Sequence, residues 1–323
     1  MKYYVAFDGG GSKVEAILFD ENLKKIRHAR MTGMNTASTS RETVSANAHK
    51  LMDELLDGTG VTEIENVYGA FSGIILGTLK EKIKVNNENH VSGEAKMGLL
   101  AAFVYGSAIT ALSGTGSVIF WPKDEKTCYE AGAFGSVIHD EGSGYHMARM
   151  AFAECIKEYE KRGPSTLMTK FICEHFNAED IGEAGYNVYH FEGRDPIPAL
   201  ASCAPCVGKA ARRGDEIAKH LLRECAARLA EQTIGLINRS DAPVDIPIVT
   251  EGGHWKNDKL MFEAYTEYIH AFQPERQVLA PYFEPIIGGV LAKPHYDGEE
   301  ITDEMIEFLK EEYKDFIYKY SDN

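Results

Sequence analysis

Short apolar runs alternate with longer amphipathic segments along the first part of the chain. Residues 2–8 and 13–20 are rich in aromatic and aliphatic residues, a pattern that predicts two strands with a buried face. Residues 42–60 carry apolar side chains at helical spacing and end on two glycines, which favours a helix with a sharp stop. Residues 66–74 predict another strand entering a loop, and residues 93–106 predict a helix.

The rest of the chain continues this alternation with a larger share of helix. Residues 107–121 predict a strand, a glycine turn and a strand, whereas residues 142–240 are mainly helical. Residues 245–255 predict a strand that runs into a glycine turn, and residues 281–292 predict a loop followed by a helix rich in small residues. Residues 301–320 predict one amphipathic helix. Strands and helices that alternate over this length predict an α/β fold.

One uncharged stretch, residues 97–122, is long enough to span a bilayer. Its glycines and hydroxyl side chains divide it into a helix, a strand and a turn, so we predict buried core rather than a membrane span. The apolar run before Asp8 is too short for a signal peptide. Six scattered cysteines suit a reducing compartment, so we expect a cytoplasmic protein. Cys203 and Cys206 form a C-x-x-C without a second ligand pair, which favours helix packing over a redox or zinc role.

Composition narrows the classes of partner. The chain has 323 residues, enough for two domains, and its 44% hydrophobic and 26% charged residues are typical of a globular protein. Its formal net charge of −15 argues against nucleic acid, because binding the phosphate backbone depends on clustered lysine and arginine. A nucleotide is compatible with this charge, because a few local donors and a metal ion can hold it.

The glycine turn near the N-terminus has a counterpart later in the chain. Placing YVAFDGGGSKVEAILFD over ITALSGTGSVIFWPKD aligns two glycines and a serine of each turn, namely Gly9, Gly11 and Ser12 with Gly114, Gly116 and Ser117. This internal repeat indicates two domains that begin alike. Backbone N–H groups in two such turns can converge on a polyphosphate, since no side chain blocks its approach.

Two commoner phosphate motifs do not fit the first turn. A Walker loop has its lysine before the serine or threonine and then opens a helix. Here Lys13 follows Ser12, and the chain continues as a strand. A dinucleotide fingerprint needs a third glycine where Val14 stands, and it also opens a helix. The motif is therefore strand, turn and strand.

As a set, these motifs resemble the sugar kinase/Hsp70/actin superfamily. Residues 8–12 and 113–117 look like its two phosphate loops, and Gly252-Gly253 looks like its adenosine loop. The segment HDEGSGYHMARMAF, residues 139–152, resembles the G-D-E-G-S-[GA]-Y stretch of the BadF/BadG/BcrA/BcrD ATPase family, which includes the N-acetylglucosamine kinases. The motifs follow that family's order from residue 5 to 292, so the resemblance covers nearly the whole chain.

The resemblance implies a two-domain actin-like (ribonuclease H-like) ATPase fold with an interdomain nucleotide cleft. On this reading residues 1–112 form the first domain, and residues 113–300 form the second with a helical insertion. The C-terminal helix, residues 301–323, is expected to pack back on the first domain. ATP and Mg²⁺ are the implied cofactors and a small-molecule sugar is the implied substrate, without nucleic acid or membrane, and a homodimer is left open.

The first turn carries the strongest candidate, Asp8. Phosphoryl transfer needs Mg²⁺ on the β- and γ-phosphates, and an aspartate beside the turn can hold that ion, so we assign Asp8 a catalytic and metal-binding role. Its alternative is an ordinary turn residue. Gly10, Gly11 and Ser12 are expected to donate to phosphate, and Lys13 is expected either to add charge there or to be a solvated strand residue.

The other two turns complete the predicted nucleotide site. Gly114, Thr115 and Gly116 are expected to form the opposing phosphate grip. Gly252 and Gly253 are expected to let the backbone approach the nucleoside, and a plain strand-to-helix turn is their alternative.

The acceptor hydroxyl needs a general base. The resembling kinases have an aspartate in an N-D-A-like stretch, and Glu94 takes that place here with Gly93 instead of the asparagine. We predict Glu94 as the base; the alternative is a solvated glutamate that stabilises a helix start.

Four further positions look like the family's sugar-binding residues, namely Asn35, Ser72, Gly73 and Asp140. Asp140 has an alternative role in capping the next helix. The family often has G-G-W-G before this motif, whereas Ala133 and Phe134 stand here, with His139 where glycine is usual.

Three functions remain open on this reading. The leading one is ATP-dependent phosphorylation of an amino sugar or related hexose, as in N-acetylglucosamine kinases. The alternatives are an ATPase activator of the BadF type without sugar kinase activity, and a non-catalytic sensing module. Such activators carry cysteines for an iron–sulfur cluster at a dimer interface. Here no cysteine stands beside either glycine turn, and the cluster-type cysteine spacings are absent.

Overall fold

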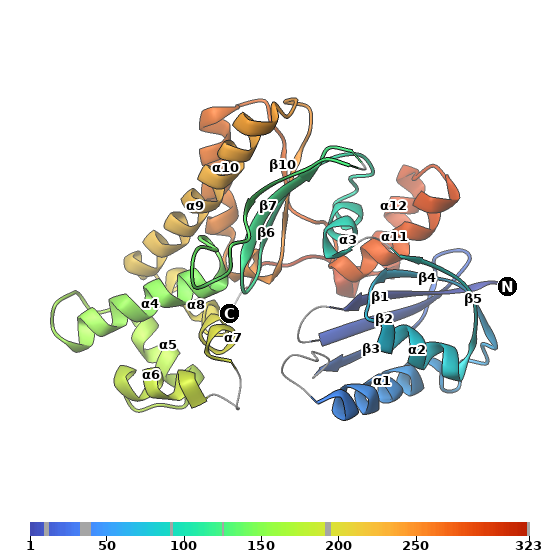
Figure 1. Cartoon of the computed structure of the whole chain (residues 1–323), viewed down its shortest axis with the longest axis horizontal. Helices are drawn as coiled ribbons and strands as arrows, with labels where there is room; N and C mark the ends of the chain where they lie inside the picture. Colours follow the sequence, from blue (N-terminus) through green and yellow to red (C-terminus); the bar gives the residue numbers. More distant parts are fainter. Residues whose placement is uncertain (10–12, 33–39, 91–92, 125, 191–194, 322–323) are drawn as a thin grey trace. The chain divides into compact units, whose positions relative to one another are not determined.

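In the computed structural model the chain forms two compact units (Figure 1). Unit 1 comprises Met1–Gly106 and Pro281–Tyr318, and unit 2 comprises Ser107–Ala280 and Lys319–Asn323. The structure describes the whole chain apart from residues 10–12, 33–39, 91–92, 125, 191–194 and 322–323. The chain thus has two domains, as its length and its internal repeat led us to expect.

Unit 1 is built on a five-stranded sheet in the order β3-β2-β1-β4-β5. The strands are β1 (Tyr3–Gly9), β2 (Lys13–Asp20), β3 (Lys25–Thr32), β4 (Glu63–Ala70) and β5 (Lys84–His90). The first three strands form an antiparallel meander, whereas β1, β4 and β5 run parallel. The predicted strand pair around the first glycine turn is therefore confirmed.

Both faces of this sheet are covered by helices. The helices are α1 (Arg41–Leu56), α2 (Gly73–Lys82), α3 (Gly93–Ala101), α11 (Pro285–Asp297) and α12 (Asp303–Glu312). Side chains alternate along β1, so that one set packs in a cluster with α1 and α2 and the other in a cluster with α3, α11 and α12. This two-sided burial explains why β1 is apolar at nearly every position.

The boundary between the units differs from the sequence prediction. Unit 1 first ends at Gly106 rather than at residue 112, and residues 281–300, which the sequence assigned to the second domain, belong to unit 1. The cause is the close packing of α11 on α3 and β1. A Cβ added at Gly288 would overlap the backbone of Met97, and one added at Gly289 would lie 2.9 Å from Cβ of Ala6.

The C-terminal helix is shorter than predicted. Thr302 is its N-cap and accepts a bond from the backbone N–H of Met305, but α12 ends at Glu312. The chain then forms a short 3₁₀ turn, η3 (Lys314–Phe316). Tyr313 is fully buried there and donates a 2.8 Å hydrogen bond to the carbonyl oxygen of Leu23. This long-range contact stops the helix where the amphipathic pattern alone continues.

Unit 2 repeats the sheet topology of unit 1, with the order β10-β9-β6-β7-β8. Its strands are β6 (Ile109–Ser113), β7 (Ser117–Pro122), β8 (Cys128–Gly132), β9 (Ile248–Glu251) and β10 (Val278–Leu279). As in unit 1, three strands form an antiparallel meander, and the first of them also pairs in parallel with a later strand. The internal repeat predicted from the two glycine turns is therefore a repeat of the whole sheet.

The helical part of unit 2 packs with its sheet in one hydrophobic core. Its helices are α4 (Gly144–Tyr159), α5 (Leu167–Phe176), α6 (Ile181–His190), α7 (Pro196–Ala201), α8 (Pro205–Arg212), α9 (Glu216–Ser240), the 3₁₀ helix η2 (Gly253–Asn257) and α10 (Lys259–Phe272). All six cysteines are free thiols, and Cys203 and Cys206 are buried in this core. Among the described residues, no helix is long and apolar enough to cross a membrane.

Candidate functional site

Asp8 lies near the end of β1, where the first glycine turn begins. It is half-buried, and in the β1–β2 hairpin it stands opposite Glu15. The glycines and serine predicted to bind phosphate, Gly10, Gly11 and Ser12, lie outside the described residues. The strands on either side of the turn, β1 and β2, are paired up to Gly9 and Val14.

Lys13 follows the turn and lies close to an acidic partner. Its Nζ is 3.2 Å from Oε1 of Glu15, and Nε of Arg30 is 3.5 Å from the same oxygen. Glu15 is buried, so these two cations compensate a charge that would be costly to bury alone. In this structure the Lys13 ammonium therefore lies along the strand beside Glu15.

The carboxyl ends of the parallel strands bring several predicted residues to one edge of the unit 1 sheet. In register, Asp8 stands beside Ala70, and Gly69 stands beside His90. The chain then leaves β4 toward α2 and β5 toward α3 on this same edge. In open α/β sheets, ligands bind outside the carboxyl ends of the strands.

Ser72 and Gly73 lie at the start of α2, and Glu94 lies at the start of α3, the two helices that follow β4 and β5. Ser72 is the exposed N-cap of α2, and its hydroxyl makes no capping bond. Glu94 is the second residue of α3; its side chain is not among the described ones, and the predicted sugar-binding Asn35 lies outside the described residues. Unit 1 thus gathers Asp8, Ser72, Gly73 and the backbone of Glu94 at one sheet edge.

The second glycine turn, Gly114–Thr115–Gly116, joins β6 and β7 in unit 2. The serines that flank it anchor it to the segment before α4. The Ser113 hydroxyl donates a 2.8 Å bond to the Gly142 carbonyl oxygen, and the Ser117 hydroxyl donates a 2.9 Å bond to that of Glu141. The sequence analysis did not predict these two contacts. The serines at both ends of the S-G-T-G-S motif, Ser113 and Ser117, are the signal that could have indicated them.

The first turn of α4 also holds the glycine turn. The backbone N–H of Gly144 donates to the Gly114 carbonyl oxygen at 2.8 Å, and that of Tyr145 donates to Thr115 at 3.2 Å. The carbonyl groups of the glycine turn are thereby directed at the helix. A Cβ added at Gly114 would meet nothing within 4 Å, so another side of the turn has open space.

Asp140 lies directly against this turn. A Cβ added at Gly116 would be only 2.6 Å from its Oδ2, which itself accepts a 3.2 Å bond from the Ser136 hydroxyl. Its side chain is almost fully buried, and its backbone has a positive φ of 52°. The other oxygen, Oδ1, is buried and has no hydrogen-bond partner within the part of the chain that the structure describes. Such an acceptor is unusual in a folded protein and points to a missing donor.

Gly252 and Gly253 form a third turn at the same edge of the unit 2 sheet. Strand β9 runs parallel to β6, so the turn after Glu251 lies beside the turn after Ser113. Gly252 has a φ of 101°, and an added Cβ would overlap the carbonyl oxygen of Ser113. Only glycine therefore fits at this position. Gly253 is exposed, and nothing lies within 4 Å of its own Cβ position.

His254, the residue after Gly253, is buried close to the start of α4. It is 4% exposed, and its Nδ1 is 2.7 Å from the Asn257 side-chain nitrogen and 3.6 Å from the Cβ position of Gly144. Burial lowers its pKa from 6.5 to about 3, with a smaller contribution from His146. His254 is thus a neutral packing residue between η2 and the start of α4.

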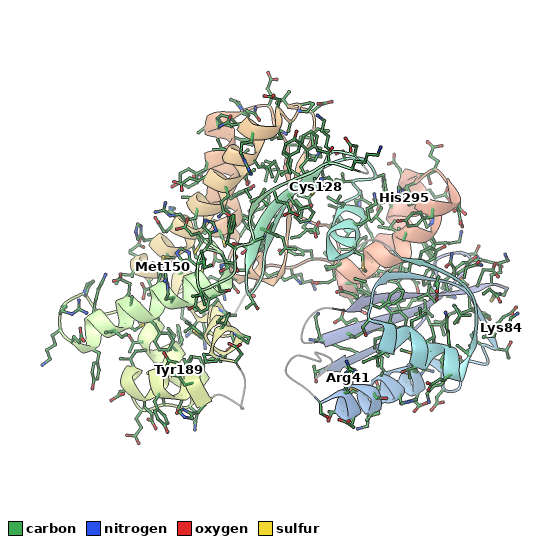
Figure 2. The ribbon with its side chains drawn as sticks, viewed as in Figure 1. Arg41, Lys84, Cys128, Met150, Tyr189 and His295 are labelled. Atoms are coloured by element: carbon green, nitrogen blue, oxygen red, sulfur yellow. The ribbon has the colours of Figure 1, made fainter. Side chains whose placement is uncertain are left out.

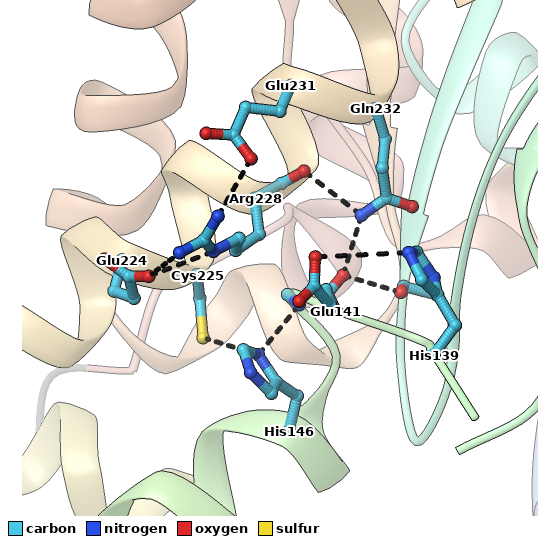
Figure 3. A network of polar contacts seen from close by, with 10 residues as sticks. His139, Glu141, His146, Glu224, Cys225, Arg228, Glu231 and Gln232 are labelled. Carbon is cyan, nitrogen blue, oxygen red and sulfur yellow. Dashed lines mark hydrogen bonds and ion pairs between the residues drawn. The ribbon is translucent and has the colours of Figure 1, made fainter. Parts of the chain in front are cut away.

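A polar network also supports the backbone between Asp140 and α4 (Figure 3). Nδ1 of His146 accepts a 3.1 Å bond from the backbone N–H of Gly142, and the Gln232 amide donates a 3.0 Å bond to the Glu141 carbonyl oxygen. Burial lowers the pKa of His146, which keeps the ring neutral and its Nδ1 free to accept. Helices α4 and α9 therefore hold this segment from two directions.

A surface hollow lies in another part of unit 2. It has a volume of about 1070 Å³ and is lined by residues of α4, α5 and the start of α6, among them Glu158, Lys170 and Asp180. None of the predicted site residues lines it. The glycine turns and Asp140 are therefore a separate feature of the unit.

These motifs can be compared with known proteins. The sequence model of the BadF/BadG/BcrA/BcrD ATPase family matches residues 6–292. The chain belongs to the BadF/BadG/BcrA/BcrD ATPase family. This membership confirms the resemblance inferred from the glycine turns and from the segment around Asp140.

Two curated relatives align with this family member over most of its length. The N-acetylmuramic acid/N-acetylglucosamine kinase of Clostridium acetobutylicum is 22% identical over 305 residues, which are 90% of this chain and 98% of the relative. The N-acetyl-D-glucosamine kinase of Dictyostelium discoideum is 22% identical over 315 residues, which are 89% of this chain and 96% of the relative.

Solved structures share the fold of this family member. A candidate N-acetylglucosamine kinase from Porphyromonas gingivalis superposes with a TM-score of 0.66 at 14% identity, covering 92% of this chain and 100% of the other. A ROK family glucokinase from Streptomyces griseus, solved with glucose and AMPPNP, gives 0.58 at 16% identity, covering 90% and 97%. At these identities the likeness establishes the two-domain α/β ATPase fold.

Proposed function

We propose that this protein transfers the γ-phosphoryl group of ATP to a hydroxyl group of an amino sugar or related hexose. The observation that carries the proposal is Asp140, a buried carboxylate with an unpartnered oxygen held against a glycine turn. A sugar hydroxyl is a suitable donor for Oδ1, and the adjoining turn offers backbone groups to a phosphate. The kinase names of the two curated relatives support the same chemistry.

The glycine turns are the residues that we assign to the nucleotide. In unit 2, Gly114, Thr115 and Gly116 suit the phosphates, because the Gly114 position is open and its carbonyl group is directed at α4. Gly252 and Gly253 suit the nucleoside, because the exposed Gly253 leaves room for close approach. We assign Gly10, Gly11, Ser12 and Lys13 of unit 1 to the phosphates on sequence grounds.

Asp8 fits a magnesium ion that arrives with ATP. Among the described residues, no group of three or more histidine, cysteine or acidic side chains is placed to hold a metal ion. A single carboxylate suits hydrated Mg²⁺, which takes most of its ligands from water and phosphate oxygens. When bound, this ion would neutralise negative charge on the β- and γ-phosphates.

Glu94 would act as the general base for the sugar hydroxyl. The hydroxyl oxygen bonds to the γ-phosphorus, the bond from that phosphorus to the β,γ-bridging oxygen breaks, ADP leaves, and the hydroxyl proton passes to the Glu94 carboxylate. Asn35, Ser72, Gly73 and Asp140 would orient the sugar. A hydroxyl held in line with the γ-phosphate reacts far faster than one that diffuses freely.

The proposal is tested by measuring ADP release with ATP, Mg²⁺ and a panel of hexoses and amino sugars. We expect sugar-dependent release that falls roughly 100-fold or more in Glu94→Gln and in Asp8→Asn. Glu311→Gln is the matched control, because the Glu311 side chain is 84% exposed on α12. ADP release that is the same with every sugar and unchanged in Glu94→Gln would overturn the kinase and favour a nucleotide-driven ATPase.

A further inference from the structure

The chain passes between the two units three times. It leaves unit 1 after Gly106, returns at Pro281 and leaves it again after Tyr318, so that Lys319 and the residues that follow belong to unit 2. The first two passages are required by the order of the strands. The third is not, because all the strands of the two sheets precede Pro281. The last passage therefore needs a different explanation.

The chain is paired within unit 1 up to the point where it leaves. The backbone N–H of Tyr318 donates a 2.9 Å bond to the carbonyl oxygen of Tyr282. The neighbouring residues, Phe283 and Ile317, form an antiparallel bridge. These contacts fix where residue 319 begins.

Residues 319–321, which we call the strap, bind to unit 2. The backbone N–H of Ser321 donates a 2.8 Å bond to the carbonyl oxygen of Lys256 in η2. The Tyr320 ring packs on the Phe262 ring of α10, with centroids 6.3 Å apart. Burial raises the pKa of Tyr320 to about 12, the direction expected for a phenol removed from water. The strap is therefore held by a backbone bond and by a packed ring.

The strap contacts the helix that continues from the third glycine turn. Helix η2 begins at Gly253, and Lys256 follows three residues later, which is one turn of a 3₁₀ helix. The orientation of this single turn therefore depends on how Lys256 is held. Trp255 anchors η2 in the core independently, since it is fully buried and its Nε1 donates a 2.9 Å bond to the carbonyl oxygen of Ala111. We expect variants of the strap to fold for this reason.

We propose that the strap is a positioning element for an adenine nucleotide: by holding η2 it keeps the Gly252–Gly253 turn in the conformation that accepts the nucleoside. Tyr320 and Ser321 are its positioning residues. Because the strap continues from Tyr318, it also joins this turn covalently to unit 1. The inference rests on the proposed function in one respect, since it takes Gly252 and Gly253 as the nucleoside-binding turn.

Binding of ADP with Mg²⁺ to the full chain, measured by calorimetry, tests the inference. Ser321→Pro removes the N–H group that bonds to Lys256, whereas Ser321→Ala keeps it. If the binding-competent conformation of the turn becomes less populated, the apparent Kd rises by the same factor. We expect Ser321→Pro to raise the Kd for ADP about threefold to tenfold, the effect of one lost hydrogen bond, and Ser321→Ala to keep the wild-type value.

Tyr320→Ala tests the other contact of the strap. It removes the ring that packs on Phe262, and we expect a rise in the Kd for ADP of similar size, with Tyr320→Phe close to wild type. Tyr189→Ala is the matched control, because Tyr189 is 70% exposed on α6 (Figure 2). An equal rise in Tyr320→Ala and Tyr189→Ala would overturn the inference.

Two further measurements separate positioning from a merely structural role. KM for ATP should rise with the Kd for ADP, while kcat at saturating ATP stays within about twofold. Amide hydrogen exchange of residues 253–257 should be faster in Ser321→Pro than in Ser321→Ala, with no change in residues 114–116. Faster exchange with an unchanged Kd for ADP, or a rise in KM for the sugar as large as that for ATP, would overturn the inference.

Failure of this inference is distinct from failure of the proposed function. If sugars are phosphorylated and Ser321→Pro binds ADP like the wild type, the inference is overturned and the kinase stands. If no sugar is phosphorylated but Ser321→Pro weakens ADP binding, the inference stands and the kinase is overturned. A wild-type protein that binds no ADP would overturn both.

Discussion

Gly116 and Asp140 are so close that a side chain at Gly116 would displace the carboxylate, since its Cβ would lie 2.6 Å from Oδ2. The conformation of the second glycine turn and the position of the proposed sugar-binding carboxylate therefore depend on each other. Glycine is needed at position 116 because the Cβ of any other residue would collide with the Asp140 carboxylate.

This contact predicts the outcome of Gly116→Ala. Asp140 can rotate away at the cost of its Ser136 bond, so we expect little loss of stability but an increase of roughly tenfold in KM for the sugar, the effect of losing about 1.4 kcal/mol. Gly114→Ala is the matched control, because its Cβ would meet nothing within 4 Å. It should leave the sugar KM unchanged, and an equal rise in both variants would contradict the assignment.

Asp140 itself should be important for activity and dispensable for stability. Asparagine also tolerates a positive φ, so Asp140→Asn keeps the backbone conformation while removing the charge. We expect kcat/KM for the sugar to fall at least tenfold, with the melting temperature unchanged or raised, because a buried acceptor without a partner is destabilising. Thermal unfolding and steady-state kinetics on the same samples check both parts. A clear loss of stability without loss of activity would assign Asp140 a structural role.

The buried His254 predicts acid sensitivity of the fold. Its pKa is about 3 in the folded state and 6.5 as an unperturbed side chain. Between these two pH values the unfolded state therefore binds a proton on this ring and the native state does not. The contribution of His254 to stability is complete above pH 6.5 and is lost as the pH falls toward 3, by about 1.4 kcal/mol per pH unit.

Urea unfolding at pH 7 and pH 5 measures this effect. The wild type should lose about 2 kcal/mol of unfolding free energy to His254 over this range, and His254→Gln, which cannot titrate, should lose correspondingly less. His49, whose side chain is 44% exposed, gives the control variant His49→Gln, which should keep the wild-type slope. Identical slopes in all three proteins would show that His254 is accessible to protons in the native state.

The serines that flank the second glycine turn should differ in their effect on stability. Ser113→Ala leaves the Gly142 carbonyl oxygen without that donor in a buried site, which typically costs about 1–3 kcal/mol. Ser117→Ala should cost less, because the Glu141 carbonyl oxygen keeps the Gln232 amide as a donor. Thr115→Ala in the same turn is the control, since Thr115 is exposed. A larger fall in the urea midpoint for Ser117→Ala than for Ser113→Ala would contradict this account.

The local residue pattern predicted the central strands and helices well. It failed where contacts between distant segments determine the secondary structure. The glycine hairpins, α1 and the strand β9 follow from their own residues. The polar strands β3 and β5 do not, because their sequences KIRHARMT and KVNNENH carry no apolar run, and they are strands through pairing with β2 and β4.

The sequence by itself determined that this protein has two domains, each opened by a glycine hairpin, and that Asp8, Glu94 and Asp140 are its candidate acids. The two domains follow from the internal repeat, and the candidate acids follow from the resemblance of their surrounding motifs to those of the family; neither needs knowledge of distant contacts. Only the tertiary structure decided that α11 belongs to unit 1, that Tyr313 ends the last helix, and that Asp140 lies against Gly116 with one oxygen unpartnered. These features depend on burial between segments far apart in the chain, and no local pattern records such contacts.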